Sequence, residues 1–172
     1  MLFSIITALF SKINLSTFID AHFKYKSQIR NDIYNKRYNL YFEFNEKTIS
    51  PLYNNSRLAF DDKYIAILHL YSPQFQALAS YEVLTYFEKF FQFVIGEYTK
   101  YTQYESSVFP APIPIELDNG EEDWAYDPSE MERFDNNKRI YQIDHAPTAE
   151  QLDSYISELY NSMRNDLGSN IK

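Results

Sequence analysis

The segment SPQFQALASYEVLTYFEKFFQFVIGEYTKYTQY, residues 72–104, constrains the fold more than any other part of the chain. Its large apolar side chains recur at the spacing of one helix face, and Ser72 and Pro73 suit an N-cap and a first helical position. The sequence therefore predicts a long helix that the rest of the chain must cover, with a bend or a close backbone approach at Gly96. The predicted buried face carries Leu84, Phe87, Phe91, Val94, Tyr98 and Tyr101, and Phe90 and Ile95 widen it.

Further helices are predicted near both ends of the chain. Residues 1–35 form an N-terminal amphipathic segment, in which apolar side chains follow helical spacing over residues 1–15 and again from Ser16, a candidate N-cap. Residues 148–168 predict a closing helix, because Thr148 and Gln151 form a capping box and Gly168 suits a helix end. Residues 1–15 can pack on the domain, on a partner or another copy, or on a membrane. Protein packing is expected, since their polar face is not rich in Lys and Arg.

Between these helices, three segments predict strands. In residues 37–46, Tyr38, Leu40, Phe42 and Phe44 alternate with more polar side chains, which is typical of a half-buried strand. Residues 63–72 are apolar on both faces, residues 138–144 read as a further strand, and residues 48–60 leave room for a short one. The expected fold class is α+β: a small antiparallel sheet of three to four strands packed against a long central helix, with amphipathic helices at both ends. The length of 172 residues predicts a single domain.

Composition excludes several kinds of chemistry. The chain has no cysteine, so disulfides and thiolate metal sites are excluded and a reducing, cytoplasmic location is expected. Gly96, Gly120 and Gly168 are too far apart for a GxGxxG turn or a P-loop. The N-terminal apolar run lacks the features of a secretory signal, and Lys12 interrupts it before the ~20 apolar residues of a spanning helix. We therefore expect no cofactor and no membrane contact.

One short motif has catalytic potential. Asp61, Asp62 and Lys63 resemble the acid, acid-x-lysine arrangement of metal-dependent nucleases, in which two carboxylates hold a cation and a lysine stabilises the attacking water. The same residues also suit a turn before an apolar segment. A metal-dependent nuclease or hydrolase is therefore kept as an alternative function, with an upstream glutamate supplied by Glu43 or Glu46.

The histidines do not predict a metal centre. His22, His69 and His145 belong to no HxxxH or HExxH pair, and the acidic stretch lacks the ligand spacing of an EF-hand. Asp144 and His145 follow a predicted strand, where a proton-transfer pair is often found, but they equally suit a polar turn before a capped helix. No catalytic residue and no metal ligand is therefore assigned.

The strongest functional signal is a concentration of acidic residues. Residues 116–135 contain nine acids and one base, Arg133, for a net charge of −8, which equals the net charge of the whole chain. They belong to an expected loop, residues 106–137, which begins with Pro110, Pro112 and Pro114 at alternate positions, a pattern typical of an extended edge segment. Such a loop repels nucleic acid and attracts basic protein surfaces.

The only tryptophan, Trp124, lies in the middle of this acidic stretch. A central aromatic side chain supplies burial in an interface that charges alone cannot supply. The alternative is that Trp124 packs back against the domain while the acids face water, and the sequence leaves both open. The candidate partner-binding residues are Glu116, Asp118, Glu121, Glu122, Asp123, Trp124, Tyr126 and Asp127.

These observations predict a non-catalytic protein-binding module, an acidic inhibitor of a basic or nucleic-acid-binding partner. Immunity proteins, antitoxins and phage anti-defence proteins provide the analogy of charge, although no family motif is present. A structural subunit that assembles through its N-terminal helix is the third hypothesis, and basic side chains in residues 24–37 can bind an acidic partner or balance the acidic loop.

Overall fold

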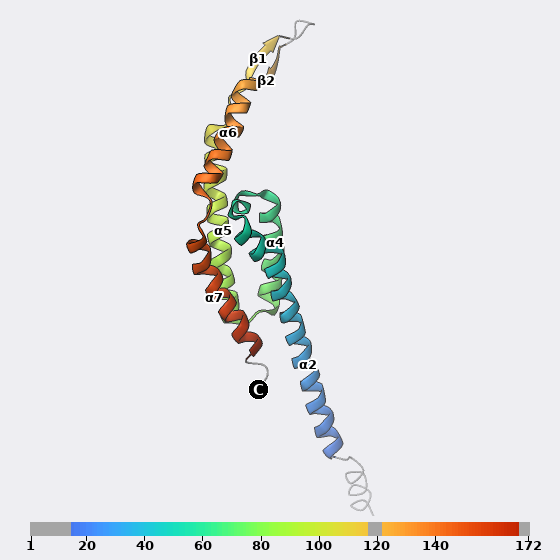
Figure 1. The fold of residues 1–172 in the computed structure, drawn as a ribbon. Coiled ribbons are helices and arrows are strands. Elements are labelled where there is room, and N and C mark those ends of the chain that lie inside the picture. Colours follow the sequence, from blue (N-terminus) through green and yellow to red (C-terminus); the bar gives the residue numbers. More distant parts are fainter. Residues whose placement is uncertain (1–14, 117–121, 169–172) are drawn as a thin grey trace, which may run out of the picture.

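The computed structural model describes residues 15–116 and 122–168, so the predicted helix over residues 1–15 lies almost wholly outside the described residues. The chain is an elongated, mostly helical molecule with one small antiparallel sheet at its upper end (Figure 1). The elements are α2 (Leu15–Phe44), the π-helix η1 (Asn45–Ile49), α3 (Ser50–Asn54), the 3₁₀ helix η2 (Ser56–Phe60), α4 (Asp62–Leu78), α5 (Tyr81–Val108), β1 (Ile113–Glu116), β2 (Glu122–Ala125), α6 (Pro128–His145) and α7 (Ala149–Gly168).

The body of the molecule is a helical core packed around aromatic rings. It comprises the end of α2 from Arg37, the segments η1 to α4, the first part of α5, and α7. Phe44 lies at its centre, with its ring centroid 4.9 Å from Phe75 and 5.5 Å from Phe87, and Phe75 and Phe87 stack at 4.1 Å. Phe44, Phe75 and Phe90 are fully buried and Phe87 is 1% exposed, so aromatic packing dominates this core.

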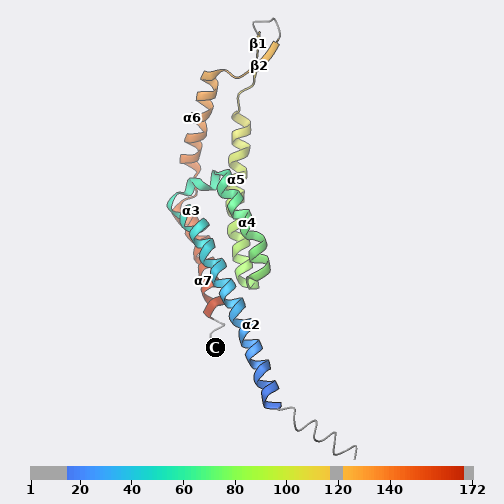
Figure 2. The same cartoon turned by 90° about the vertical axis from the view of Figure 1, so that its right-hand side faces the viewer.

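Two parts of the molecule project from the body in opposite directions (Figure 2). One is the start of α2, here called the free segment, residues 19–36, in which no residue is buried. The other is the arm, formed by α5 from Tyr101, the hairpin of β1 and β2, and α6. Between them, the Arg37 Nη1 is 2.8 Å from Asp166 Oδ1, and the Tyr41 hydroxyl donates to Asp166 Oδ2 at 2.7 Å. This buried cluster ties the root of the free segment to α7.

The strand expected over residues 37–46 is wrong, because this segment is the end of α2 and the start of η1. The alternation of aromatic side chains misled the prediction. Leu40, Tyr41 and Phe44 are buried at helical spacing, whereas Phe42 is 55% exposed and stacks on Tyr38 on the outer side of the helix. An exposed aromatic residue such as Phe42 completes an every-second-residue apolar pattern in the sequence, which is the pattern expected of a half-buried strand.

The strand expected over residues 63–72 is also wrong and is part of α4, in which Tyr64, Ile65, Leu68 and Tyr71 are the buried residues of a helix face. The strand expected over 138–144 is the second half of α6, where Ile140 and Ile143 are each 56% exposed. In the described residues, the sheet therefore consists of β1 and β2 alone and does not reach three or four strands. Residues 48–60 form helical turns rather than a short strand.

The long central helix is two helices. α4 ends at Leu78, Ser80 caps α5 by accepting from the Val83 amide at 3.4 Å, and the predicted first helical position, Pro73, lies inside α4. A Cβ at Gly96 would meet nothing within 4 Å, so the predicted close approach there is wrong.

The closing helix is confirmed, with Thr148 and Gln151 exchanging backbone-to-side-chain hydrogen bonds at 2.9 and 3.2 Å. No described helix combines the length and the apolar character needed to cross a membrane.

Candidate protein-binding site

The acidic stretch forms the tip of the arm. β1 and β2 pair antiparallel, with Pro114 opposite Trp124 and Ile115 opposite Asp123. Pro110 and Pro112 precede β1 and Pro114 lies within it, where it removes a backbone donor, so the alternate prolines coincide with an edge strand, as the sequence predicted. The stretch expected to be one loop is therefore a hairpin arm followed by the first turns of α6.

The arm holds its shape through a thin seam of aromatic rings between α5 and α6. Tyr141 stacks on Tyr104 with ring centroids 4.2 Å apart, and Phe134 meets Phe109 edge-on at 5.1 Å. Phe134 is the one buried residue of α6. Because so few side chains are buried here, the arm is stabilised much less by burial than the body.

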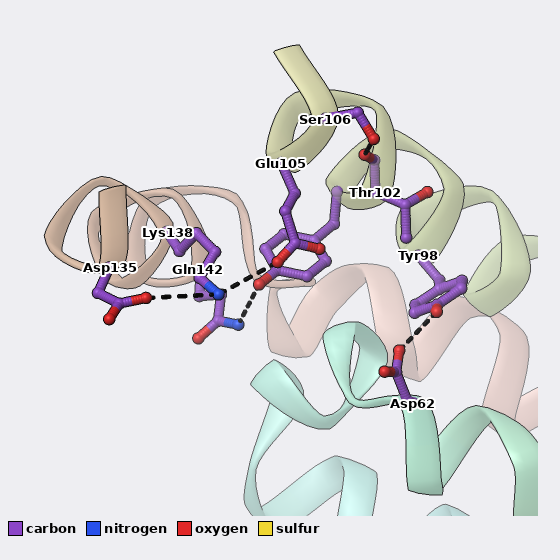
Figure 3. A network of polar contacts seen from close by, with 9 residues as sticks. Asp62, Tyr98, Thr102, Glu105, Ser106, Asp135, Lys138 and Gln142 are labelled. Carbon is purple, nitrogen blue, oxygen red and sulfur yellow. Dashed lines mark hydrogen bonds and ion pairs between the residues drawn. The ribbon is translucent and has the colours of Figure 1, made fainter. Parts of the chain in front are cut away.

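Polar contacts brace the lower end of the seam (Figure 3). Lys138 Nζ lies 3.1 Å from Glu105 Oε1 and 3.6 Å from Asp135 Oδ1, so it bridges the two helices. Gln142 Nε2 donates to the Tyr101 hydroxyl at 3.1 Å. These contacts are partly exposed, so their main effect is to orient α6 along α5.

Trp124 faces outward at the tip of the arm. Its side chain is 65% exposed, which decides against the interpretation that it packs under the acidic stretch. Other apolar side chains of the arm are also exposed: Phe109 is 48%, Ile113 47% and Tyr126 44% exposed. Phe109 supports Tyr126 edge-on at 5.3 Å, so these rings form a supported apolar surface beside the tryptophan.

Acidic side chains surround this surface. Glu116 and Asp123 are exposed, and Asp127 caps α6 by accepting from the backbone amide and the hydroxyl of Ser129 at 2.8 and 2.7 Å. These hydrogen bonds to Ser129 lower the pKa of Asp127 below its ordinary value. Asp118 and Glu121 lie outside the described residues, and Glu122 is placed by its backbone in β2.

The arm therefore combines exposed aromatic side chains with carboxylates on one projecting element. The sequence identified Trp124, Tyr126 and the acids but missed Phe109 and Ile113. The alternate prolines marked the edge segment that contains Ile113, but no signal marked Phe109, which caps the end of α5.

Asp61 and Asp62 of the nuclease-like motif accept hydrogen bonds from within the fold. Asp61 caps α4 by accepting from the Tyr64 amide at 2.8 Å, and Asp62 accepts from the Tyr98 hydroxyl at 2.5 Å (Figure 3). The hydrogen bond to Asp62 raises the pKa of Tyr98 to about 12.

Two cavities lie on or beside the body. One of about 290 Å³ is lined by the motif residues Asp61, Asp62 and Lys63 together with Phe60, Tyr101, Glu105 and Lys138. The other, of about 310 Å³, lies away from the motif, between α3 and α7.

The upstream glutamates do not complete a nuclease centre. Glu43 pairs with Lys47 at 3.2 Å, and no group of three or more His, Cys, Asp or Glu side chains positioned to hold a metal ion occurs in the described part of the chain.

The three histidines lie apart from this motif. His22 and His69 are exposed, and the His145 ring stacks on Tyr141 at 4.1 Å while its Nδ1 lies 3.1 Å from the Tyr141 carbonyl.

Comparison with known proteins found no match to a protein-family model, to a curated protein or to a solved structure.

Proposed function

We propose that the chain is a non-catalytic protein-binding module whose arm binds a basic protein surface. The observation that carries this proposal is Trp124, 65% exposed on the β2 strand between acidic residues. Carboxylates steer a basic partner toward the arm, and the indole supplies the desolvated contact that retains it.

The shape of the arm supports the same function. A hairpin on two extended helices presents its side chains well away from the body, so a partner can contact the tip from several sides (Figure 1). The charge of the arm suits a partner that binds nucleic acid through a basic surface, which the acids would occupy in place of phosphates. This is the charge chemistry of immunity proteins, antitoxins and phage anti-defence proteins, and an inhibitor is the specific class we propose.

The test uses the fluorescence of the single tryptophan. Poly-L-lysine serves as the basic probe, and three proteins are titrated: the wild type, an arm variant (Glu116→Lys, Asp123→Lys and Glu132→Lys) and a body control. The body control (Glu88→Lys, Asp153→Lys and Glu158→Lys) changes the net charge equally at exposed positions.

The wild type and the body control should show a salt-sensitive change in Trp124 emission, and the arm variant should show a much smaller one. Equal responses of the arm variant and the body control would contradict the proposal, because binding would then follow net charge alone. A partner captured from host extract must show the same ranking and must also lose affinity on Trp124→Ala.

A further inference from the structure

The free segment of α2 is a second uncovered surface, and it continues the face that enters the core. At 100° per residue, Ile19, Phe23, Ile29 and Ile33 lie on the same side of α2 as the buried Leu40 and Phe44. Their side chains are 41% to 66% exposed. An apolar helix face that runs straight out of a core is normally covered by another element.

The same face is basic. Lys26 and Arg30 lie within the apolar stripe, whereas the two acids of the free segment, Asp20 and Asp32, lie off it on either flank. Lys24, Lys26, Arg30 and Lys36 are exposed, and none of them forms an ion pair with any described residue. The surface therefore selects an occupant that is both apolar and acidic.

The arm has that chemistry at its tip, where the exposed rings of Trp124 and Tyr126 lie on the same hairpin as the exposed acids Glu116 and Asp123. Exposed Ile140 and Ile143 continue the apolar character of the arm along α6. The exposed acids of this helix outnumber its exposed bases: Glu130, Glu132, Asp135 and Asp144 against Arg133 and Arg139. The two surfaces point away from each other in one chain, so the arm cannot reach the free segment of its own chain (Figure 2).

We propose that two copies of the chain pair antiparallel, with the free segment of each lying along the arm of the other. This proposal rests on the proposed function, because it uses the same arm and names a second copy as one occupant. A two-fold arrangement forms both contacts at once and closes at two copies. Direct pairing of two free segments is disfavoured, because Lys26 and Arg30 would face like charges.

The pairing has a functional consequence. The second copy covers the arm until a basic partner competes for it, so partner binding should convert the dimer into single chains. The two associations share the arm and are therefore mutually exclusive.

The test is a charge swap followed by sedimentation equilibrium on the full chain. One variant reverses the free segment (Lys26→Glu, Arg30→Glu and Lys36→Glu), and the other is the arm variant defined above. Their controls reverse the same number of charges on the body, at Arg57, Lys63 and Arg164 or at Glu88, Asp153 and Glu158. Circular dichroism of every variant verifies that the helices are intact.

The wild type and both controls should have twice the chain mass at about 50 mM NaCl and the mass of one chain at about 500 mM. Each variant alone should dissociate at least about tenfold more readily, because like charges then face each other in both contacts. An equimolar mixture of the two variants should form a dimer again, since both contacts are complementary in the mixed pair.

Three results would overturn the pairing: a wild-type monomer at low salt, a mixture that stays monomeric, or species that grow beyond two copies with concentration. An arm variant that dimerises as the wild type does would also overturn it and would indicate contact between free segments. If dimerisation fails but the poly-L-lysine titration distinguishes the arm variant from its control, only this inference falls. If both fail, the function proposed for the arm falls with it.

Discussion

The body and the arm use aromatic side chains in opposite ways. In the body, Phe44, Phe75, Phe87 and Phe90 are almost fully shielded from water and contact one another. In the arm, Tyr101 and Phe134 are buried in the thin seam, but Phe109 and Tyr126 are nearly half exposed and Trp124 is mostly exposed. The high aromatic content, 18% of residues, therefore stabilises the fold in one region and forms a surface in the other.

This difference shows why composition alone is a poor guide to function here. Aromatic residues in a core are explained by packing, and only those that the fold leaves uncovered need another explanation. Exposed rings also occur on the body, as at Tyr53 and Tyr81. On the arm and on the free segment, however, they lie together with other exposed apolar side chains and with charges of opposite sign.

The largest expected effect comes from removing a core ring. Phe44→Ala should lower the free energy of unfolding by about 3–5 kcal/mol, because it opens a cavity at the meeting point of four aromatic side chains. Trp124→Ala is the matched change in the arm and should alter the free energy of unfolding by less than about 0.5 kcal/mol. Urea denaturation followed by circular dichroism measures both, and similar losses in the two variants would remove the distinction between the regions.

The next effect concerns the buried cluster at the root of the free segment. Asp166→Ala leaves Arg37 and Tyr41 without this acceptor and should cost about 2–3 kcal/mol, less than a fully buried pair, because Arg37 is partly exposed and still donates to the Leu78 carbonyl at 2.6 Å. Glu158→Ala is the control, since its contact with Lys89 is 3.8 Å long and exposed, and it should have almost no effect. A loss below about 0.5 kcal/mol for Asp166→Ala would mean that the cluster contributes little.

A stabilising change is expected in α5, which runs through both regions. Gly96→Ala should raise the free energy of unfolding by about 1 kcal/mol, because alanine favours the helix and the added methyl group meets no neighbour within 4 Å. Thermal unfolding should show a higher midpoint for this variant. A lower midpoint would indicate that another part of the chain approaches α5 at this position.

The smallest effect is confined to the arm and depends on pH. The folded pKa of Asp127 lies below its ordinary value of 3.8, so its stabilisation of α6 is present above that pH and is lost as the pH falls through the folded pKa. Hydrogen exchange in the first turn of α6 should therefore accelerate in acid while α7 stays protected. Asp127→Asn keeps the cap without the charge and should remove this pH dependence, and an unchanged acid response in that variant would assign it to another group.

The closing helix and the acidic, aromatic composition of the tip could be predicted because their signals are local. Thr148 and Gln151 form their capping box wherever the helix packs, and Trp124 lies among acids in any fold. The sequence could not distinguish a strand from a helix over residues 37–46. Tyr38 and Phe42 are apolar but exposed, so counting them as buried residues produced a false strand pattern.

The break between α4 and α5 and the role of Asp166 could not be predicted either. Ala79 and Ser80 leave the helical conformation where the chain folds back onto the core, which depends on long-range packing of Phe75 against Phe87. Asp166 contacts residues more than a hundred positions earlier in the chain, and sequence spacing gives no signal for such a pair.

Acrylamide quenching of the single tryptophan tests most directly whether the arm exposes Trp124 to a partner, in contrast to the buried rings of Phe44, Phe75, Phe87 and Phe90 in the body. The measurement uses the variant with a reversed free segment, so that a second copy does not cover the arm. Trp124 should show emission close to that of a solvated indole and efficient quenching, which poly-L-lysine then reduces. A blue-shifted emission that acrylamide barely quenches in the free chain would place Trp124 inside the fold and contradict its proposed role in binding.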